Sequence, residues 1–291
     1  STVTVNDTIS PNAICQDIVV QVDASGNASI VPSQVNNGSN DACGISSLVL
    51  DVTTFNCSVV GANTVTLTVT DFNGNTSTCT SNVTVEDNVN PNALCQGITV
   101  QLDANGDASI TASQIDNGST DNCSIASLDV TPNTFDCSNV GANTVTLTVT
   151  DVNGNTDNCT ATVTVEDNIN PTAVCQDITV QLGALGTVSI TANDIDNGSS
   201  DNCAIATLVI DQTSFDCTEV GANTVTLTVT DVNGNVSTCD ATVSVQDTVS
   251  PTAVCQDITV QLDASGNLTI TSVDVDGGSN DNCGIASLEI D

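Results

Sequence analysis

The chain has 291 residues, of which 35 are Asp or Glu and none is Lys, Arg or His, so its formal net charge is −35. A charge of this sign and size excludes nucleic acid and anionic membranes as partners, because both require a basic protein surface. Hydrophobic residues make up 39% of the sequence, which predicts packed domains rather than a disordered acidic chain.

The sequence repeats with a period of 80 residues, marked by Pro11, Pro91, Pro171 and Pro251. A fixed long period indicates an array of one structural unit. We expect the last strand and linker of a preceding unit at 1–10, complete repeats at 11–90, 91–170 and 171–250, and the first half of a fourth repeat at 251–291. Half a unit would expose strand edges and core residues, so either the chain is a window on a longer array or a neighbouring copy completes the half unit by adding strands. Residues 1–10 supply one strand and no cysteine, so we expect the longer array.

Each repeat predicts several short strands, which the second copy illustrates in chain order. The stretch ITVQLDANGDASIT at 98–111 predicts a pair of strands around a glycine-containing turn, and SIASLDV at 124–130 predicts one more. At 141–165, GANTVTLTVTDVNGNTDNCTATVTV alternates apolar and polar residues on both sides of an Asn-Gly turn, which is the pattern of a hairpin. No helical periodicity occurs over a useful length.

The predicted fold class is therefore all-β, a tandem array of small antiparallel β-sandwiches that forms an elongated rod. The core of each sandwich is expected to be thin, with one recurring aromatic residue at Phe55, Phe135 and Phe215. Domains of this size usually need covalent staples for stability.

The 14 cysteines form no Cys-X-X-Cys pairs and histidine is absent, so disulfides are predicted and structural zinc is not. Disulfides indicate an oxidising compartment, and we expect an extracellular or cell-surface location. In a tandem array, the chain enters each domain at one end and leaves it at the other. The Asn-Gly turn before the last strand therefore lies at the entry end, and this places the cysteine after that turn near the cysteine after the first proline. Among three connectivities per unit, this geometry favours Cys15–Cys79, Cys95–Cys159 and Cys175–Cys239, and it leaves Cys43–Cys57, Cys123–Cys137 and Cys203–Cys217.

Two spaced motifs resemble the hyalin repeat (HYR) family. They are D-N-x-x-P-x-A-x-C at the start of a unit and G-x-N-T-V-T-L-T-V-T-D-x-N-G-N-x-x-x-C near its end. The resemblance covers the whole chain and is strongest to the tandem repeats of secreted, surface-attached bacterial proteins. It implies an immunoglobulin-like sandwich and an adhesive or structural role, and it carries no catalytic residues. The second cysteine pair and the lack of basic residues depart from the family pattern.

The same end-to-end geometry predicts that acids gather at the junctions between units. Near residue 90, the linker, the Asn-Gly turn and the loop at 116–122 each contribute carboxylates or amides. Ca²⁺ takes six to eight oxygen ligands of these kinds, and such junctions resemble those of cadherin-like and adhesin rods, where calcium stiffens the linker. The expected calcium ligands are Asp7, Asp41, Asp71, Asn73, Asn75, Glu86, Asp87, Asn90, Asp116, Asp121, Asp151, Asn153, Asn155, Glu166, Asp167, Asn170, Asp196, Asp201, Asp231, Asn233, Asn235 and Asp247.

A second interpretation of these acids is that Asp, Asn and Gly simply make turns and that the carboxylates form a solvated face. It fully explains the turn DANGD at 103–107, because the equivalent turn at 183–187 is GALGT and holds no acid. It explains the linker acids less well. Clustered acids repel one another, and the chain has no cationic side chain to offset them.

Two functions follow from the sequence. The first is a structural stalk or filament of calcium-stiffened repeats, whose partners are further repeats or copies of itself. The second is an adhesin whose repeats bind a glycan or protein. The near identity of the units, with GANTVTLTVTD unchanged at 61, 141 and 221, favours the structural role. Ice binding by rows of threonine is a weaker third hypothesis.

Enzymatic function is not expected, because His, Lys, Arg and Tyr are all absent. Glycosylation is a further expectation for an exposed surface protein. The Asp-Thr-apolar stretches at 7–9 and 247–249 resemble O-glycosylation motifs. Asn-X-Ser/Thr triplets are frequent, for example at Asn27, Asn37, Asn82, Asn117, Asn197 and Asn267.

Overall fold

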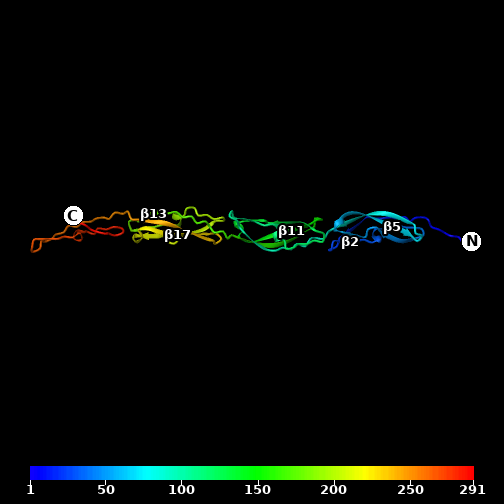
Figure 1. Ribbon diagram of the computed structural model, residues 1–291, viewed down its shortest axis with the longest axis horizontal. Helices are drawn as coiled ribbons and strands as arrows, with labels where there is room; N and C mark the ends of the chain where they lie inside the picture. The colour runs from blue at the N-terminus through cyan, green and yellow to red at the C-terminus, as the bar shows by residue number, and fades with distance from the viewer. The chain divides into compact units, whose positions relative to one another are not determined.

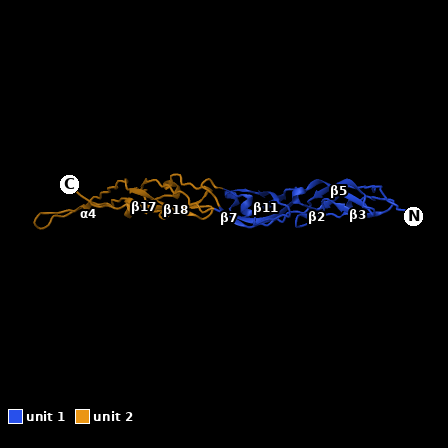
Figure 2. Ribbon diagram, turned by 45° about the vertical axis from the view of Figure 1, so that its right-hand side comes forward, with its two compact units in different colours: residues 1–100, 108–166 blue, residues 101–107, 167–291 orange.

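The computed structural model describes residues 1–291 and is built mainly of β-strands. The chain divides into two compact units, residues 1–100 with 108–166 and residues 101–107 with 167–291 (Figure 2). Each unit is described by itself below. Unit 1 holds a first and a second β-sandwich, and unit 2 holds a third sandwich and the residues that follow it.

The three sandwiches contain the same series of elements (Figure 1). The first has β1 (Ile18–Gln21), β2 (Asn27–Ser29), α1 (Pro32–Val35), β3 (Ile45–Leu50), β4 (Thr54–Asn56), η1 (Cys57–Val59), β5 (Gly61–Asp71) and β6 (Thr76–Glu86). The second has β7 (Ile98–Gln101), β8 (Asp107–Ser109), α2 (Ala112–Ile115), β9 (Ile125–Thr131), β10 (Thr134–Asp136), η2 (Cys137–Asn139), β11 (Gly141–Asp151) and β12 (Thr156–Glu166). The third has β13 (Ile178–Gln181), β14 (Thr187–Ser189), α3 (Ala192–Ile195), β15 (Ile205–Ile210), β16 (Ser214–Asp216), η3 (Cys217–Glu219), β17 (Gly221–Asp231) and β18 (Val236–Gln246), and α4 (Ser272–Val275) follows it.

A four-stranded sheet dominates each sandwich, with the order β1-β6-β5-β3 in the first. The long hairpin of β5 and β6 forms its centre, and β3 pairs antiparallel with β5. Strand β1 lies parallel to β6, with Ile18 opposite Val83. The short strands β2 and β4 form a second, two-stranded sheet. The other sandwiches repeat this order, as β7-β12-β11-β9 with β10-β8 and as β13-β18-β17-β15 with β14-β16.

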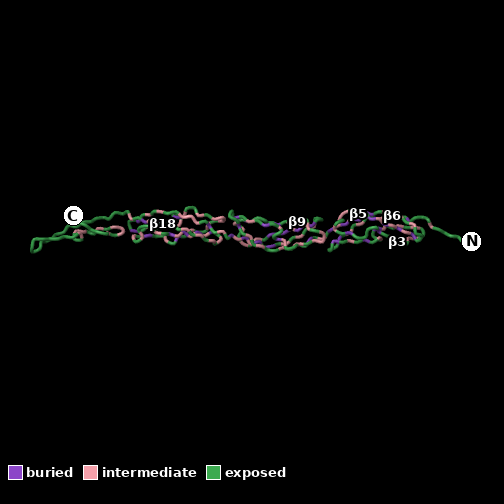
Figure 3. Tube along the Cα trace, in the orientation of Figure 1, coloured by how far each residue is buried: buried purple, intermediate pink, exposed green.

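The core follows directly from the alternation in the hairpin. On β5, Val65, Leu67 and Val69 are fully buried, while the threonines between them lie on the other face of the sheet. Figure 3 shows the burial of the residues along the chain trace. Phe55, from β4 of the small second sheet, is also buried in this core. Equivalent residues build the core of the third sandwich. The predicted class of tandem all-β sandwiches is therefore confirmed.

The local elements differ from the expectation in two respects. The two strands around the glycine-containing turn do not pair with each other, because β1 joins the large sheet and β2 pairs with β4. Each sandwich also contains a helix of four residues, such as α1. A single turn is too short to show helical periodicity, and this explains why the pattern did not predict it.

The long-range disulfides are confirmed. Cys15–Cys79, Cys95–Cys159 and Cys175–Cys239 each join cysteines 64 residues apart within one sandwich. On chain-entropy grounds, closing a loop of this length contributes about 4 kcal/mol. Each of these disulfides therefore links the start of a sandwich to its long hairpin and stabilises a domain whose core is thin.

The other predicted pairings are wrong. Cys57 bonds to Cys123 of the following sandwich in unit 1, and Cys217 bonds to Cys283 in unit 2. The predicted pairs Cys43–Cys57, Cys123–Cys137 and Cys203–Cys217 therefore do not form, and Cys43 is a free thiol, as is Cys255. The physical reason is that the 3₁₀ turn carrying Cys57 packs against the following sandwich, where its sulfur lies near the Asn122 carbonyl.

Peptide mapping without reduction tests these assignments. We expect one cross-linked peptide that contains Cys57 and Cys123, and a second that contains Cys217 and Cys283. Cys43, which is exposed, should react with an alkylating reagent before any reductant is added. A peptide that joins Cys43 to Cys57 would contradict the structure.

Candidate cation-binding clusters

The first component of each cluster is an aspartate that ends the long strand of the hairpin. In the second sandwich this is Asp151, which is only 2% exposed. Its Oδ1 accepts backbone N–H bonds from Asn153 and Asn155, both at 2.8 Å, and its Oδ2 accepts the Asn155 side-chain amide at 2.8 Å. An aspartate at this position closes the Asn-Gly turn on itself, so local turn chemistry explains both of its oxygens.

Asp231 holds the same position in the third sandwich, and its pKa illustrates the balance of forces. Burial opposes ionisation of this carboxyl group. Hydrogen bonds from the Asn235 side chain and from the backbone N–H groups of Asn235, Asn233 and Gly234 nevertheless lower its pKa below the ordinary value. The turn therefore holds a buried carboxylate in its charged form.

The second component comes from the linker between two sandwiches. Asp87 follows the last residue of β6 and is 6% exposed. Its Oδ1 accepts the Val89 N–H at 3.1 Å and the Asn122 side-chain amide at 3.2 Å. Its backbone carbonyl accepts the Asn155 side-chain amide at 3.0 Å. The linker is thus tied to two separate segments of the following sandwich.

The third component is the loop that precedes β9. Asp121 Oδ2 accepts the N–H groups of Cys123 and Ser124 at 2.7 and 2.9 Å. The neighbouring Asn122 donates its side-chain amide to the Asp23 carbonyl of the preceding sandwich at 3.1 Å, and also to Asp87. Asn122 is therefore the one side chain of the cluster that contacts both sandwiches of unit 1.

These three segments converge on one point. Asp87, Asp121 and Asp151 each place a carboxylate oxygen within 4.8 Å of the others. Asp87 Oδ2, Asp121 Oδ1 and Asn122 Oδ1 are all buried, and none of them accepts a hydrogen bond. Buried oxygens without a partner are rare and costly, and the chain has no cationic side chain that reaches them.

Unit 2 repeats the cluster. Asp167, Asp201 and Asp231 lie within the same 4.8 Å limit. Asp167 is 6% exposed, and its Oδ2 is again buried without a hydrogen bond, as is Asp201 Oδ1. The same unpaired atoms therefore recur at equivalent positions, which argues against an accident of one loop.

A third grouping near the start of the chain is different in composition. Asp7, Asp41 and Cys43 lie within 4.8 Å of one another. A hydrogen bond to Asp7 and the charges of Asp7, Asp41 and Asp71 raise the pKa of the Cys43 thiol. Asn75 donates its side-chain amide to the Asp7 carbonyl at 3.2 Å, as Asn155 does to Asp87.

The remaining expected ligands take other positions. Asp116 and Asp196 lie outside the clusters, because each is held in its own loop, where a hydrogen bond from Ser119 or Ser199 lowers its pKa. Asn75, Asn155 and Asn235 tie the turn to the linker through their amide nitrogens. The other acids lie outside the groups of three: Glu86 and Glu166 at the strand ends, and Asp247 after β18. Asn73, Asn153 and Asn233 lie in the turns, where Asn233 Oδ1 is buried without a hydrogen bond, and Asn90 and Asn170 are exposed in the linkers.

Asn122 is the cluster residue that sequence reasoning missed. A signal was present, because Asp-Asn-Cys occurs at 121–123, 201–203 and 281–283, whereas the first copy reads Asp-Ala-Cys at 41–43. Carboxylate oxygens form the donor set of the Asp87–Asp121–Asp151 and Asp167–Asp201–Asp231 clusters, and Asn122 adds a buried amide oxygen next to Asp121 in unit 1. Such a set suits a hard divalent cation, and a coordinating cation would satisfy the unpaired oxygens.

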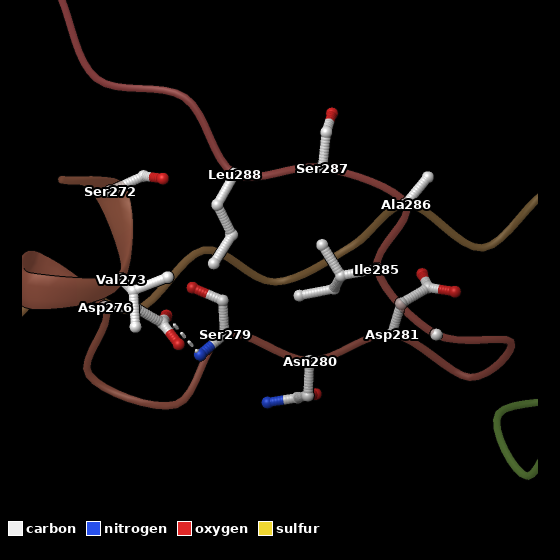
Figure 4. A pocket seen from close by; sticks show the side chains of 11 residues that line it. Ser272, Val273, Asp276, Ser279, Asn280, Asp281, Ile285, Ala286, Ser287 and Leu288 are labelled. Atoms are coloured by element: carbon white, nitrogen blue, oxygen red, sulfur yellow. Dashed lines mark hydrogen bonds between the residues drawn. The ribbon is translucent and has the colours of Figure 1, made fainter.

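Unit 2 also has a surface hollow that contains no group of three carboxylates. It lies among residues 272–288 and is lined by polar and apolar residues alike, including Ser279, Asn280, Ile285 and Leu288 (Figure 4). Asp276 Oδ1 accepts the Ser279 N–H at 2.8 Å and Asp281 Oδ1 accepts the Cys283 N–H at 2.9 Å, while Asp281 Oδ2 is buried without a hydrogen bond. We assign no function to this hollow. No helix of the chain is long and apolar enough to cross a membrane.

Comparison with known proteins relates the chain to hyalin. No protein-family profile matches it. It is 32% identical over 275 residues to hyalin from Strongylocentrotus purpuratus, a match that covers 87% of this chain and 22% of hyalin. The chain thus spans about a fifth of the length of that relative. The match does not support the bacterial version of the repeat that the motifs suggested.

Solved structures with similar segments are distant. Extracellular cadherin domains 1–4 of protocadherin gamma B7 match at a TM-score of 0.30 and 13% identity, covering 75% of this chain and 70% of that one. Three immunoglobulin domains of titin match at a TM-score of 0.33 and 9% identity, covering 82% and 100%. Overlays of this quality do not bear on function. The sequence match supports a likeness between these repeats and hyalin, and the structure shows that they are all-β sandwiches.

Proposed function

We propose that the chain is a structural segment of an extracellular repeat protein, in which Ca²⁺ bound at the acidic clusters fixes each sandwich to the next. The observation that carries the proposal is the buried, unpaired Oδ2 of Asp87, a residue that also places a carboxylate oxygen within 4.8 Å of the carboxylates of Asp121 and Asp151. Asp167 repeats this arrangement in unit 2. A divalent cation supplies the partner that these atoms lack.

Turn formation does not account for the clusters. It explains Asp151, whose two oxygens accept three hydrogen bonds inside the turn. It does not explain Asp121 Oδ1 or Asp87 Oδ2, which are buried and take no part in any turn. Without a cation, three ionised carboxylates would repel one another at close range. Calcium converts this repulsion into attraction between segments.

The origin of the ligands supports a role in joining sandwiches. Asp87 belongs to the linker, whereas Asp121 and Asp151 belong to the sandwich that follows it. A cation bound to all three restrains the linker against that sandwich. Asn122 extends the restraint to Asp23 of the preceding sandwich. We propose repeat boundaries at residues 11, 91, 171 and 251 on this basis, and an extended, filament-like array as the result.

An extracellular location is part of the proposal. Every cysteine except Cys43 and Cys255 is disulfide-bonded, which suits an oxidising compartment. The likeness to hyalin also favours an adhesive or structural role over enzymatic activity. The partners expected of a structural array are further repeats and copies of the chain. Binding of a glycan or protein by the repeat surface is the second candidate function, and the hyalin likeness is the observation that favours it.

Calorimetric titration of the full chain with Ca²⁺ tests the proposal. We expect binding to the wild-type chain and the loss of one site in Asp151→Asn, because this change removes a negative charge from the cluster in unit 1. Asp129→Asn is the matched control, since it removes the same charge from an exposed position on β9. Electron microscopy with calcium and with EDTA then measures the end-to-end length.

The expected images show longer, straighter molecules with calcium than with EDTA. Mass spectrometry under native conditions reports the bound metal independently of heat. Absence of bound calcium in the wild-type chain, or equal losses in the Asp151 and Asp129 variants, would overturn the proposal.

A further inference from the structure

The loop at 121–123 connects the cation cluster of unit 1 to a disulfide. Asp121 and Asn122 each present a buried side-chain oxygen without a hydrogen-bond partner. The next residue, Cys123, is bonded to Cys57 of the preceding sandwich. Two side chains with unpaired oxygens therefore lie directly beside a covalent bond that crosses between sandwiches.

The Cys57 side of this bond is closely packed. A Cβ atom built on Gly26 would lie 2.6 Å from the Cys57 sulfur and 2.7 Å from the Asn122 carbonyl oxygen. Only a glycine leaves room for the sulfur and the loop at once. The glycine also has a φ of 74°, which L residues with a side chain rarely adopt. The loop at 121–123 therefore packs closely against the turn at 23–26 of the preceding sandwich, and we call it the ligand loop.

Unit 2 contains the same construction. Cys217 bonds to Cys283, and a Cβ built on Gly186 would lie 2.6 Å from the Asn282 carbonyl oxygen. Asn282 donates its side-chain amide to the Gly183 carbonyl at 3.2 Å and to Asp247 Oδ1 at 3.1 Å. Its Oδ1 is buried and unpaired, as is Asp281 Oδ2. The pairing of a disulfide with a ligand loop is therefore a repeated feature.

We propose that the Cys57–Cys123 disulfide positions Asp121 and Asn122 for the cation and makes the affinity of this site dependent on redox state. The proposal rests on the calcium site proposed above. A dithiol supplies two electrons and two protons, so that the S–S bond breaks, two thiols form and the dithiol closes to its own disulfide. The loop then loses its covalent tether, and its two oxygens lose their fixed place.

The coupling must be reciprocal, because calcium and the disulfide act on one loop. If reduction weakens calcium binding by a given factor, calcium opposes reduction by the same factor at equilibrium. Cys57 and Cys123 are both partly exposed in the folded chain. Removal of groups that orient metal ligands typically costs 10–100-fold in affinity.

The first test compares two chains that each retain one cluster. Asp231→Asn leaves the cluster of unit 1, and Asp151→Asn leaves the cluster of unit 2. Into each we place the pair Cys57→Ser and Cys123→Ser and measure calcium affinity by calorimetry. We expect a loss of about tenfold or more in the Asp231→Asn chain. In the Asp151→Asn chain, which serves as the internal control, we expect calcium affinity to fall by less than about twofold.

The second test measures the reverse effect in the wild-type chain. The chain is equilibrated in dithiothreitol buffers with calcium or EDTA, and free thiols are alkylated and mapped. Calcium should shift the reduction equilibrium of Cys57–Cys123 by the factor found for affinity. Cys15–Cys79, which has a similar sequence separation within one sandwich, should shift less. A merely structural disulfide would not produce this selective response.

The outcomes separate the two proposals. Calcium binding that is equal with and without the Cys57–Cys123 bond, in chains with unchanged circular dichroism, overturns this inference alone. A reduction equilibrium that is insensitive to calcium also overturns it. A wild-type chain that binds no calcium overturns the proposed function and this inference with it. A shift confined to the unit 1 cluster supports both.

Discussion

The variant Asp87→Asn with Asp167→Asn is expected to abolish the effect of calcium on stability. In EDTA it should melt at a higher temperature than the wild-type chain, and in calcium at a lower one. Two unit charges about 5 Å apart repel by roughly 3 kcal/mol at an effective dielectric constant of about 20. Each substitution removes one charge from a cluster and replaces an unpaired oxygen with an amide that donates to the remaining carboxylates.

In the wild-type chain, calcium is expected to raise the melting temperature. A ligand that binds only the folded state at 100 times its Kd stabilises that state by about 2.7 kcal/mol. For sandwiches of this size we expect a rise of about 5 °C or more in the melting midpoint. The double variant lacks a ligand in both clusters and should show almost no rise.

Differential scanning calorimetry measures both effects. Asp129→Asn with Asp257→Asn is the matched control, because it removes two charges from exposed positions outside the clusters. That control should melt like the wild-type chain in EDTA and retain the calcium response. A cluster variant that is less stable than the wild-type chain in EDTA would show that the carboxylates do not repel one another.

The sandwich class could be predicted because its largest element is encoded locally. In β5, Val65, Leu67 and Val69 alternate with threonines, and an Asn-Gly turn separates the strand from β6, so period and turn chemistry agree. The short strand β4 has three residues, one of which is Phe55, and no pattern can be recognised at that length. The parallel pairing of β1 with β6 joins residues about 65 positions apart, and alternation carries no information about such partners.

The disulfide error has a physical origin in the repeat itself. Cys43 and Cys123 occupy equivalent positions one period apart, so the sequence alone does not tell which of them Cys57 meets. The sequence analysis assumed that both disulfides form within one repeat, and this assumption led to the pairing of Cys57 with Cys43. In the folded chain, the turn of Cys57 faces the next sandwich, and packing across the junction decides the pairing.

The cation cluster could be predicted in part, because the direction in which each strand runs determines which loops meet at one end of a sandwich. Asp87, Asp121 and Asp151 were brought together by the expectation that linker, loop and turn meet at one end of a sandwich. The direction of the strands does not reveal which carboxylate oxygens already accept hydrogen bonds. Asp116 has the same residue type as Asp121 and lies in the same loop, but Ser119 satisfies its carboxylate. Only the hydrogen-bond pattern of the folded loop distinguishes the two.

Gly26→Ala is expected to damage the junction of unit 1 far more than Gly118→Ala, although both glycines have a positive φ, 74° and 82°. The conformational cost of alanine at such angles is about 1 kcal/mol in either case. The surroundings differ. A Cβ at Gly118 meets nothing within 4 Å, whereas a Cβ at Gly26 meets the Cys57 sulfur at 2.6 Å and backbone at 2.7 Å.

This overlap adds roughly 1–3 kcal/mol of packing cost to Gly26→Ala. Backbone atoms cannot move aside as the end of a long side chain does, so the two sandwiches must separate locally. Oxidative refolding followed by peptide mapping measures the yield of the Cys57–Cys123 bond, and calorimetry measures calcium affinity. We expect both to fall in Gly26→Ala and both to match the wild-type chain in Gly118→Ala. Equal behaviour of the two variants would mean that the junction is loose enough to admit a methyl group, and that the disulfide does not hold the ligand loop in place.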